Sequence, residues 1–248
     1  MDEFADIAET YDWTEQSTDD LPFYLGLARK TPGPILEIGA GTGRVALPVA
    51  RLGKPVTALD ISEAMLARAR SKWQAEGNGP GLSFVLGDFR SLSLGKSFRL
   101  ILAPGRVFEH AVSDFDREAA FYGCAAHLFS SGTLALYVWG PPSDSNAAPP
   151  EKSSLIQPTR EHGALRFWWR EQRDFADQTR THYFRIEELD GRKRVWNHRP
   201  IKIRWYTPDA LDRLGEKAGL SVNNRFGDFT GRPFVPGSLH MIWTYMKR

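Results

Sequence analysis

Three glycines, Gly39, Gly41 and Gly43, alternate directly after the short apolar run 34–38. Glycine permits a tight turn from a strand into a helix and lets the backbone approach a ligand closely. The helix that follows offers unpaired N–H groups to a negatively charged ligand. Arg44 stands where a dinucleotide-binding loop has its third glycine, and the Gly-Lys-Ser/Thr of a phosphate-binding loop is absent. The loop therefore predicts a ligand of the nucleotide type that is held without a pyrophosphate fingerprint.

Three carboxylates stand close to the ends of apolar runs and could complete this ligand site. Glu37, two residues before the first glycine, would repel a pyrophosphate but suits a ligand that carries an ammonium group. Asp60 ends the run 55–59 and could accept hydrogen bonds from ribose hydroxyls. Asp88 follows the run 82–86 and could accept from an adenine amino group. Taken singly, Asp60 also reads as a helix cap and Asp88 as part of a common turn.

Alternating apolar runs and helical patterns indicate the elements that would position these residues. We expect strands over 34–38, 55–59, 82–86, 98–103 and 133–139, and helices over 45–52, 62–76 and 114–129. Ser62 and Thr207 are suited to cap helices, and the helix from Thr207 runs to Gly219. A closing antiparallel hairpin is expected over 220–226 and 240–245. The pattern predicts an α/β fold of the Rossmann-like, doubly wound type, with a seven-stranded, mostly parallel sheet and an antiparallel last strand.

The order Glu37, Gly39-x-Gly41-x-Gly43, Asp60, Gly87-Asp88 resembles the class I S-adenosylmethionine-dependent methyltransferases. Residues 34–140 carry the resemblance, and 207–246 carry it more loosely. It implies S-adenosylmethionine as cofactor, with Glu37 near the methionine amino group, Asp60 on the ribose and Asp88 on the adenine. Further cofactor contacts that it implies are Tyr11, Ala40, Arg44, Ile61, Met65, Phe89 and Ala103.

The segment 103–110 follows the fourth strand, where the family places groups that face the reacting sulfur. The resemblance therefore implies Glu109 and His110 as acid–base candidates and Arg106 as a contact to the methyl acceptor. Histidine suits a proton transfer near neutral pH. The alternative is that His110 caps or packs, since alignment of the reactants alone can supply much of the rate acceleration.

Residues 141–205 interrupt the alternating pattern with a Pro-rich loop and three strand-like segments near 164–171, 178–188 and 193–205. Asp190-Gly191 predicts a hairpin turn between the last two. The segment resembles the antiparallel lid of small-molecule methyltransferases, which implies acceptor contacts from Trp168, His182 and Tyr206. Its aromatic side chains could instead form only the packed face of the sheet. The predicted organisation is a helical cofactor-covering segment at 1–33, a core at 34–140 and 206–248, and a lid at 141–205.

The composition limits which classes of partner, metal site and location the sequence supports. The formal net charge of +2 is too small to imply a polyanionic partner. Cys124 is the single cysteine, so neither an intrachain disulfide nor a cysteine-based zinc cluster is expected, and we predict no metal. No apolar run approaches 18 residues, and the N-terminus lacks a secretory pattern, so we expect a cytoplasmic protein without membrane contact.

We predict a methyltransferase that acts on a nitrogen or oxygen of a small molecule, as a monomer or homodimer. One alternative is an RNA methyltransferase, because residues 160–204 hold 12 Lys or Arg against 7 Asp or Glu among aromatic residues. A cofactor-binding protein without catalysis is a second alternative. An oxidoreductase of the same topology is a weaker one, against which Glu37 and Arg44 argue.

Overall fold

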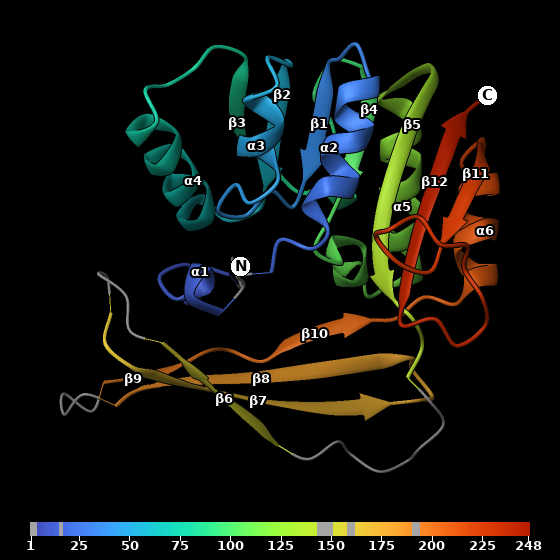
Figure 1. The fold of residues 1–248 in the computed structure, drawn as a ribbon. Helices are drawn as coiled ribbons and strands as arrows, with labels where there is room; N and C mark the ends of the chain where they lie inside the picture. The colour runs from blue at the N-terminus through green and yellow to red at the C-terminus, as the bar shows by residue number, and fades with distance from the viewer. Residues whose placement is uncertain (1–3, 15–16, 143–150, 158–161, 190–193) are drawn as a thin grey trace.

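The computed structural model describes residues 4–14, 17–142, 151–157, 162–189 and 194–248. A seven-stranded sheet, the core sheet, stands over a second sheet that runs across its lower edge (Figure 1). The first helix, α1 (Tyr11–Thr14), lies between the two sheets. The second sheet therefore covers one edge of the core sheet. The direction of the core strands determines whether their amino or their carboxyl ends lie at that edge.

The core sheet has the strand order β11-β12-β5-β4-β1-β2-β3. Its strands are β1 (Ile35–Ile38), β2 (Val56–Asp60), β3 (Leu82–Leu86), β4 (Phe98–Ala103), β5 (Leu128–Trp139), β11 (Leu220–Phe226) and β12 (His240–Lys247). β1 to β5 pair in parallel, and β12 is antiparallel to both of its neighbours. The predicted fold class is confirmed. The carboxyl ends of the five parallel strands face the second sheet (Figure 1).

Helices cover both faces of the core sheet, and each face has its own apolar cluster. One face packs against α2 (Leu21–Lys30), α3 (Ala46–Ala50) and α4 (Glu63–Ala75), and the other against α5 (Asp114–Ala126) and α6 (Pro208–Lys217). Two 3₁₀ turns, η1 (Phe89–Ser91) and η2 (Val107–His110), follow β3 and β4. The predicted caps are confirmed, since Ser62 accepts from the Met65 N–H at 3.3 Å and Thr207 from the Ala210 N–H at 3.2 Å.

The second sheet, called the lid sheet here, is antiparallel in the order β10-β8-β7-β6, with β9 also paired to β8. Its strands are β6 (Lys152–Ile156), β7 (Leu165–Asp174), β8 (Thr179–Glu188), β9 (Val195–Asn197) and β10 (Ile201–Arg204). Side chains alternate between its two faces, so one face meets the core and the other faces outward. The chain thus places an antiparallel sheet over the carboxyl edge of the core sheet, as the insertion predicts.

Some elements differ from those expected from the sequence. The helix expected over 114–129 ends at Ala126, and β5 already begins at Leu128, ahead of the strand expected over 133–139. The register of β4 on β5 shifts between Phe98 and Leu100, and Ser131 takes a φ of +62°, so a bulge lies within the longer strand. β6 is not predicted, because its residues lie exposed at a sheet edge and show no apolar alternation.

The strand expected over 193–205 is divided into β9 and β10. Pro200 lies between them and has no N–H to continue a strand ladder. The hairpin turn predicted at Asp190-Gly191 lies outside the described residues. Among the helices that the structure describes, none has both the length and the apolar character needed to cross a membrane.

Candidate active site

A cavity of about 630 Å³ lies between the carboxyl edge of the core sheet and the lid sheet. Its walls come from the glycine loop, the loops after β2, β3 and β4, the ends of β5 and β12, the N-terminal segment and the lid sheet. This volume is within the range of roughly 300–1,000 Å³ that small-molecule and cofactor sites occupy. Open α/β sheets bind ligands at this edge, so the cavity is the place to test each predicted site residue.

The glycine loop takes backbone conformations that disfavour any side chain. Gly39, Gly41 and Gly43 have φ values of +67°, +54° and +87°. A Cβ at Gly39 would lie 2.5 Å from Cγ2 of Val107, and a Cβ at Gly43 would collide with Leu47. At Gly41 a Cβ would meet no atom within 4 Å, and Gly41 lines the cavity. The first and third glycines therefore allow close packing of the loop, and the second leaves its backbone open to a ligand.

Asp60 connects the end of β2 to the glycine loop. Its Oδ2 accepts from the Gly41 N–H at 2.7 Å, and its Oδ1 accepts from the Ser62 N–H at 2.8 Å. The side chain is 7% exposed and lines the cavity. These two bonds hold Asp60 in one orientation at the cavity wall, where a carboxylate suits ribose hydroxyls.

Asp88 and Phe89 also line the cavity, together with Tyr11, Ile61 and Met65. Arg90 donates from Nε and Nη2 to the Asp88 carboxylate at 2.6 to 3.0 Å. Burial alone would raise the pKa of Asp88, but the hydrogen bonds from Arg90 outweigh it and lower this pKa. Asp88 therefore remains ionised, which suits acceptance of a hydrogen bond from an amino group.

Three predicted cofactor contacts lie just behind the cavity wall. Ala40 donates its N–H to the Leu59 carbonyl at 3.0 Å, and Ala103 is buried at the end of β4. Glu37 is 2% exposed, and its Oε2 has no hydrogen-bond partner among the described residues. Burial raises the pKa of Glu37 well above its usual range, although Arg44 acts in the opposite direction. Glu37 thus stands beneath the loop instead of on the cavity surface.

Arg44 lines the cavity but is held by another part of the chain. Its guanidinium donates to both oxygens of Asp20 and to the Ser17 carbonyl. This paired geometry fixes the planar guanidinium against the segment before α2. Arg44 therefore joins the glycine loop to that segment, a contact that the resemblance did not imply.

Residues 4–14, called the N-terminal segment here, cover the cavity and contact both sheets. Asp12 accepts from Thr42 Oγ1 at 2.6 Å and from Lys72 Nζ at 2.8 Å on the core side. On the lid side, the Arg194 guanidinium lies 3.0 Å from Glu9. Phe4, Ile7, Thr10, Tyr11 and Thr14 line the cavity from this segment. One short stretch of chain therefore closes the space above the predicted cofactor residues.

The loop after β4 brings Arg106 and His110 to the cavity but turns Glu109 away from it. Arg106 lies with its guanidinium carbon 3.9 Å from the centre of the Trp139 indole. Glu109 is fully buried, and its Oε1 accepts from the Trp139 N–H at 2.7 Å. The prediction of Glu109 as a group that contacts the reactants is wrong, because its side chain points into the protein and orders the end of β5.

His110 has surroundings that disfavour a positive charge. Burial lowers the pKa of His110 to about 3, and the positive charge of Arg106 adds to this effect. The ring of Phe4 packs edge-on against the imidazole, with centroids 5.2 Å apart. A group with so low a pKa holds a proton poorly near neutral pH. His110 therefore lines the cavity as a neutral ring, and the structure argues against its predicted role as general base.

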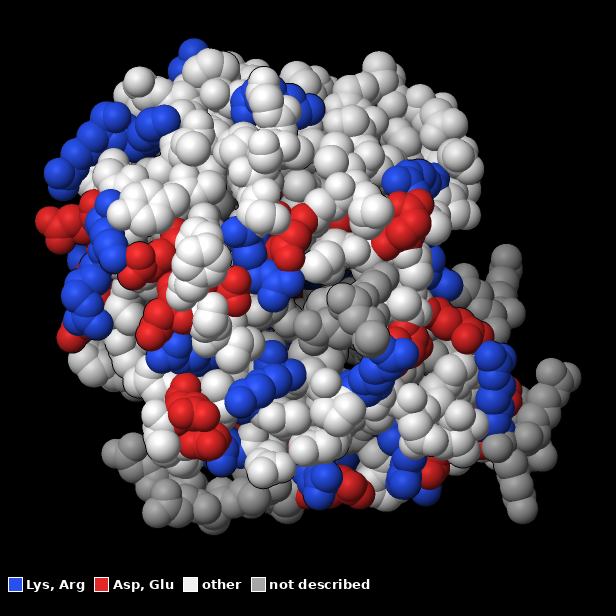
Figure 2. Space-filling view, turned by 180° about the vertical axis from the view of Figure 1, so that it is seen from behind, with Lys and Arg blue, Asp and Glu red and all other residues white. Residues whose placement is uncertain are grey.

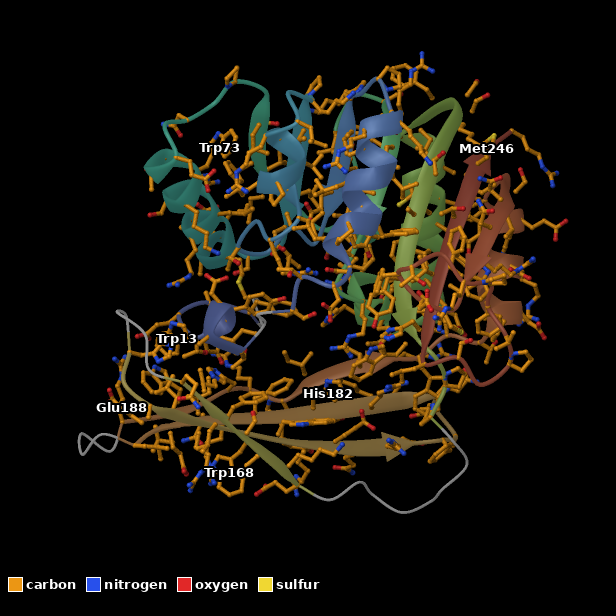
Figure 3. All side chains as sticks on the ribbon, in the orientation of Figure 1. Trp13, Trp73, Trp168, His182, Glu188 and Met246 are labelled. Carbon is orange, nitrogen blue, oxygen red and sulfur yellow. The ribbon has the colours of Figure 1, made fainter. Side chains whose placement is uncertain are left out.

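The lid contributes His182 to the cavity, but Trp168 and Tyr206 do not line it. Trp168 lies on the outer face of the lid sheet, where its Nε1 donates to Glu187 Oε2 at 3.1 Å, whereas His182 points toward the core (Figure 3). Tyr206 is fully buried and donates its hydroxyl to the Phe108 carbonyl at 3.1 Å. The predicted acceptor contacts of Trp168 and Tyr206 are wrong because both side chains have other partners away from the cavity.

Sequence reasoning missed several cavity residues that come from distant parts of the chain. Tyr137 at the end of β5 and His240 at the start of β12 are joined by a hydrogen bond of 2.9 Å between the hydroxyl and Nδ1. Phe229 packs on Tyr137 with ring centroids 4.9 Å apart. The aromatic side chains at this end of the cavity are Tyr137, Trp139, Phe167, Trp169, Phe184 and Phe229. No local motif marks Tyr137, Phe229 and His240, since only the tertiary fold brings them together, whereas Phe167, Trp169 and Phe184 belong to the insertion whose aromatic side chains are already prominent in the sequence.

Within the described ranges, no three His, Cys, Asp or Glu side chains form a group that could hold a metal ion. The described cavity walls hold carboxylates at Asp19, Asp20, Asp60 and Asp88. The first two come from the segment before α2, and the other two from the loops after β2 and β3. The end of the cavity formed by the lid sheet, β5 and β12 has no carboxylate among its described lining residues.

The low pKa of His110 predicts a pH effect on stability. In the unfolded chain the imidazole takes up a proton near its ordinary pKa of 6.5, whereas the folded protein resists protonation down to about pH 3. The free energy of unfolding should therefore fall as the pH decreases from 6.5 toward 3. His110→Gln should lose less stability than the wild-type protein between pH 7 and pH 5, as measured by urea unfolding. Equal losses in the two proteins would contradict this environment for His110.

Comparisons with known proteins agree with this geometry. A family model described as a methyltransferase domain matches residues 35–132. A dTDP-3-amino-3,6-dideoxy-alpha-D-glucopyranose N,N-dimethyltransferase from Streptomyces fradiae is 24% identical over 243 residues, which cover 94% of this chain and 91% of that protein. The CcbJ methyltransferase from Streptomyces caelestis is structurally similar with a TM-score of 0.82 and 25% identity, over 100% of this chain and 97% of that one.

A third similar protein was solved with its cofactor. CalS10, an amino pentose methyltransferase from Micromonospora echinaspora, was solved with S-adenosylmethionine bound and has a TM-score of 0.71 and 22% identity. The alignment covers 97% of this chain and 94% of that chain. The fold, the matched domain and the cavity beside the glycine loop agree with one another: this chain carries a methyltransferase domain over residues 35–132 within the fold of the class I S-adenosylmethionine-dependent methyltransferases.

Proposed function

We propose that the protein methylates the amino nitrogen of a small molecule, with an amino sugar as the first candidate. The main support is the composition of the acceptor end of the cavity, which the lid sheet, β5 and β12 form. Aromatic rings and histidines surround Arg106 there, and the described lining residues include no carboxylate. An amine that gains a methyl group becomes positively charged at nitrogen. Aromatic faces stabilise such a charge as it develops, so they favour the transition state over the neutral amine.

At the other end of the cavity, Asp60, Asp88 and the open backbone of Gly41 fit the ribose, adenine and methionine parts of S-adenosylmethionine. When bound, this cofactor supplies an activated methyl group and leaves as S-adenosylhomocysteine. The chain's own contribution is to hold the acceptor in line and to exclude water, for which the N-terminal segment and the lid sheet provide the cover. Tyr11, Ile61, Met65 and Phe89 complete the proposed cofactor contacts, and Arg106 and His182 the proposed acceptor contacts.

Nitrogen is favoured over oxygen by the proton chemistry of the site. A hydroxyl holds its proton far more tightly than an ammonium group does, so an imidazole is a much poorer base for a hydroxyl than for an ammonium group, and His110 with its low pKa is poorer still. An amine needs only to be in its neutral form. Relatives in the comparisons carry names that refer to amino sugars, which supports the same choice.

The RNA alternative loses support because five arginines of the insertion have acidic partners. Arg173 pairs with Glu171, and Arg185 pairs with Glu187 within the lid sheet. Further pairs join Arg194 to Glu9, Arg199 to Asp6 and Arg204 to Asp114. Basic and acidic side chains are interspersed on the face seen in Figure 2. Phosphate binding favours unpaired positive charge, which these arginines do not offer.

The test is turnover of S-adenosylmethionine with defined acceptors. Purified protein should form S-adenosylhomocysteine with dTDP-3-amino-3,6-dideoxyglucose or a related amino sugar, and the product should gain the mass of one methylene group. The matching sugar with a hydroxyl in place of the amine should give at least about tenfold less product. Methylation of RNA alone would contradict the proposal, and cofactor binding without transfer to any amine would favour a non-catalytic role.

We also expect a cytoplasmic protein that is a monomer or homodimer. Gel filtration measures the oligomeric state.

A further inference from the structure

Glu171 and His182 form a buried pair on the cavity side of the lid sheet. They are register partners on β7 and β8, and His182 Nε2 lies 3.0 Å from Glu171 Oε2. Glu171 is 3% exposed and His182 is 4% exposed. His182 lines the cavity and points toward the core from the middle of β8 (Figure 3). The two side chains therefore hold a fixed orientation at the acceptor end of the cavity.

The carboxylate of this pair is ionised. Burial alone would raise the pKa of Glu171, but hydrogen bonds from His182 and Arg173 outweigh it and lower the pKa to about 2. Arg180 adds positive charge, with its Nη1 3.9 Å from Glu171 Oε2. An ionised carboxylate only accepts hydrogen bonds, so His182 donates its Nε2–H to Glu171. The neutral imidazole then carries its lone pair on Nδ1, where it can accept a proton.

The remaining neighbours of His182 are aromatic or charged. The rings of Phe184, Trp169 and Trp139 lie with centroids 5.8, 5.9 and 6.5 Å from the imidazole. The charged and titratable groups that face His182 from the packed elements are Glu171, Arg173 and Arg180 on the lid and Arg106, Glu109 and His110 on the core. Of these, Glu171 alone is in direct contact with the imidazole in a described interaction and favours its protonated form.

We propose that Glu171 and His182 act as a carboxylate–imidazole pair that takes up the proton of the acceptor's ammonium group. This inference rests on the proposed function. A small-molecule amine is mostly protonated near neutral pH, so its ammonium group has to lose a proton before the nitrogen can accept a methyl group. In the proposed step the N–H bond of the ammonium breaks, its electron pair stays on nitrogen, and a new N–H bond forms at His182 Nδ1. The acceptor nitrogen is then nucleophilic, and Glu171 stabilises the imidazolium that has formed.

His110 differs from His182 in the feature that matters for this step. Both imidazoles line the same cavity, but no described carboxylate hydrogen-bonds to His110, whereas Glu171 holds His182. Glu109, the residue next to His110, accepts a hydrogen bond from the Trp139 backbone N–H with its Oε1. The lid strand, and not the loop after β4, therefore supplies the proton acceptor.

One experiment measures the effect of Glu171 on the protonation of His182 without any turnover. In protein labelled with ¹³C-histidine and bound to S-adenosylhomocysteine, the ring signal of His182 should change with pH. In Glu171→Gln the midpoint of that change should move to lower pH, because the variant lacks the charge that favours an imidazolium. Tyr183→Phe, at the adjacent outward-facing position of β8, should leave the midpoint unchanged. An identical midpoint in Glu171→Gln, or a His182 signal that does not change between pH 5 and pH 9, would overturn the proposal.

A second experiment measures kcat/KM against pH with dTDP-3-amino-3,6-dideoxyglucose as probe. His182→Gln should lower kcat by at least about 100-fold, which is the usual scale of general base catalysis. Glu171→Gln should move the acidic limb of the profile to lower pH, which a purely structural role would not do. Unchanged kcat in a folded His182→Gln variant would overturn the proposal. Failure of the wild-type protein to turn over any amine would instead count against the proposed function, and the labelled-histidine experiment would still decide whether the pair is coupled.

Discussion

Asp60→Ala is expected to abolish measurable binding of S-adenosylhomocysteine while the protein remains folded. The variant loses the acceptor for ribose hydroxyls and also leaves the N–H groups of Gly41 and Ser62 without their partner. Hydrogen bonds to a charged group contribute about 1.5–3 kcal/mol each, so the loss of two bonds to the ligand weakens affinity by roughly 100-fold or more. Titration calorimetry measures the dissociation constant, and circular dichroism verifies the fold.

Glu63→Ala is the matched control for this experiment. Glu63 is an exposed carboxylate three residues further along, and it pairs with Arg70 on the surface of α4 outside the cavity lining. Its removal should leave the affinity for S-adenosylhomocysteine within about twofold, since surface ion pairs contribute at most about 1 kcal/mol to stability. If folded Asp60→Ala binds as tightly as the wild-type protein, the placement of the ribose at the end of β2 is wrong.

Gly39→Ala is expected to weaken cofactor binding and to lower the melting temperature. The substitution adds a side chain at a φ of +67° and places its Cβ 2.5 Å from Val107 Cγ2. Alanine at a positive φ costs more than about 1 kcal/mol. Because Val107 begins η2, the collision also displaces the turn that carries Arg106 and His110. We therefore expect at least about a tenfold loss of affinity for S-adenosylhomocysteine, measured by calorimetry.

Two further variants separate the collision from the backbone effect. Gly53→Ala introduces a similar strain, at a φ of +74°, but no atom lies within 4 Å of its Cβ and the position is distant from the cavity lining. It should lower stability without changing affinity. The double variant Gly39→Ala with Val107→Gly removes both close contacts, to Cγ2 at 2.5 Å and to Cβ at 2.9 Å, and should regain part of the lost affinity. Equal affinities for Gly39→Ala and Gly53→Ala would show that contact with Val107 does not matter.

The cofactor half of the site could be predicted because its residues follow strands that share one edge. Parallel strands bring their carboxyl ends together, so Asp60 lies beside the glycine loop and Asp88 lies at the same edge of the sheet. Glu37 shows where this reasoning stops. It belongs to β1 itself, and side chains within a strand point to the faces of the sheet instead of its edge. The sequence places Glu37 near the loop but does not say that its carboxylate is buried beneath it.

The acceptor half could not be predicted to the same depth, because it depends on sheet register and on the choice of face. Trp168 and Trp169 are adjacent, and a shift of one residue would exchange their roles. The pairing of Glu171 with His182 depends on where the turn between β7 and β8 falls. Tyr137 and His240 are 103 positions apart in the chain and meet only because β12 inserts beside β5. Such contacts follow from the complete topology and have no local pattern.

We expect the N-terminal segment to couple the binding of the two ligands thermodynamically. Phe4 packs on His110 at the acceptor end, while Tyr11 lines the cavity and Asp12 is bonded to the glycine loop through Thr42. A cofactor that holds this segment in place also completes the cavity wall that the acceptor contacts. The free-energy cost of ordering the segment then opposes binding of the first ligand only, and not of the second. The two binding equilibria are then positively cooperative. By reciprocity, the acceptor increases cofactor affinity by the same factor by which the cofactor increases acceptor affinity.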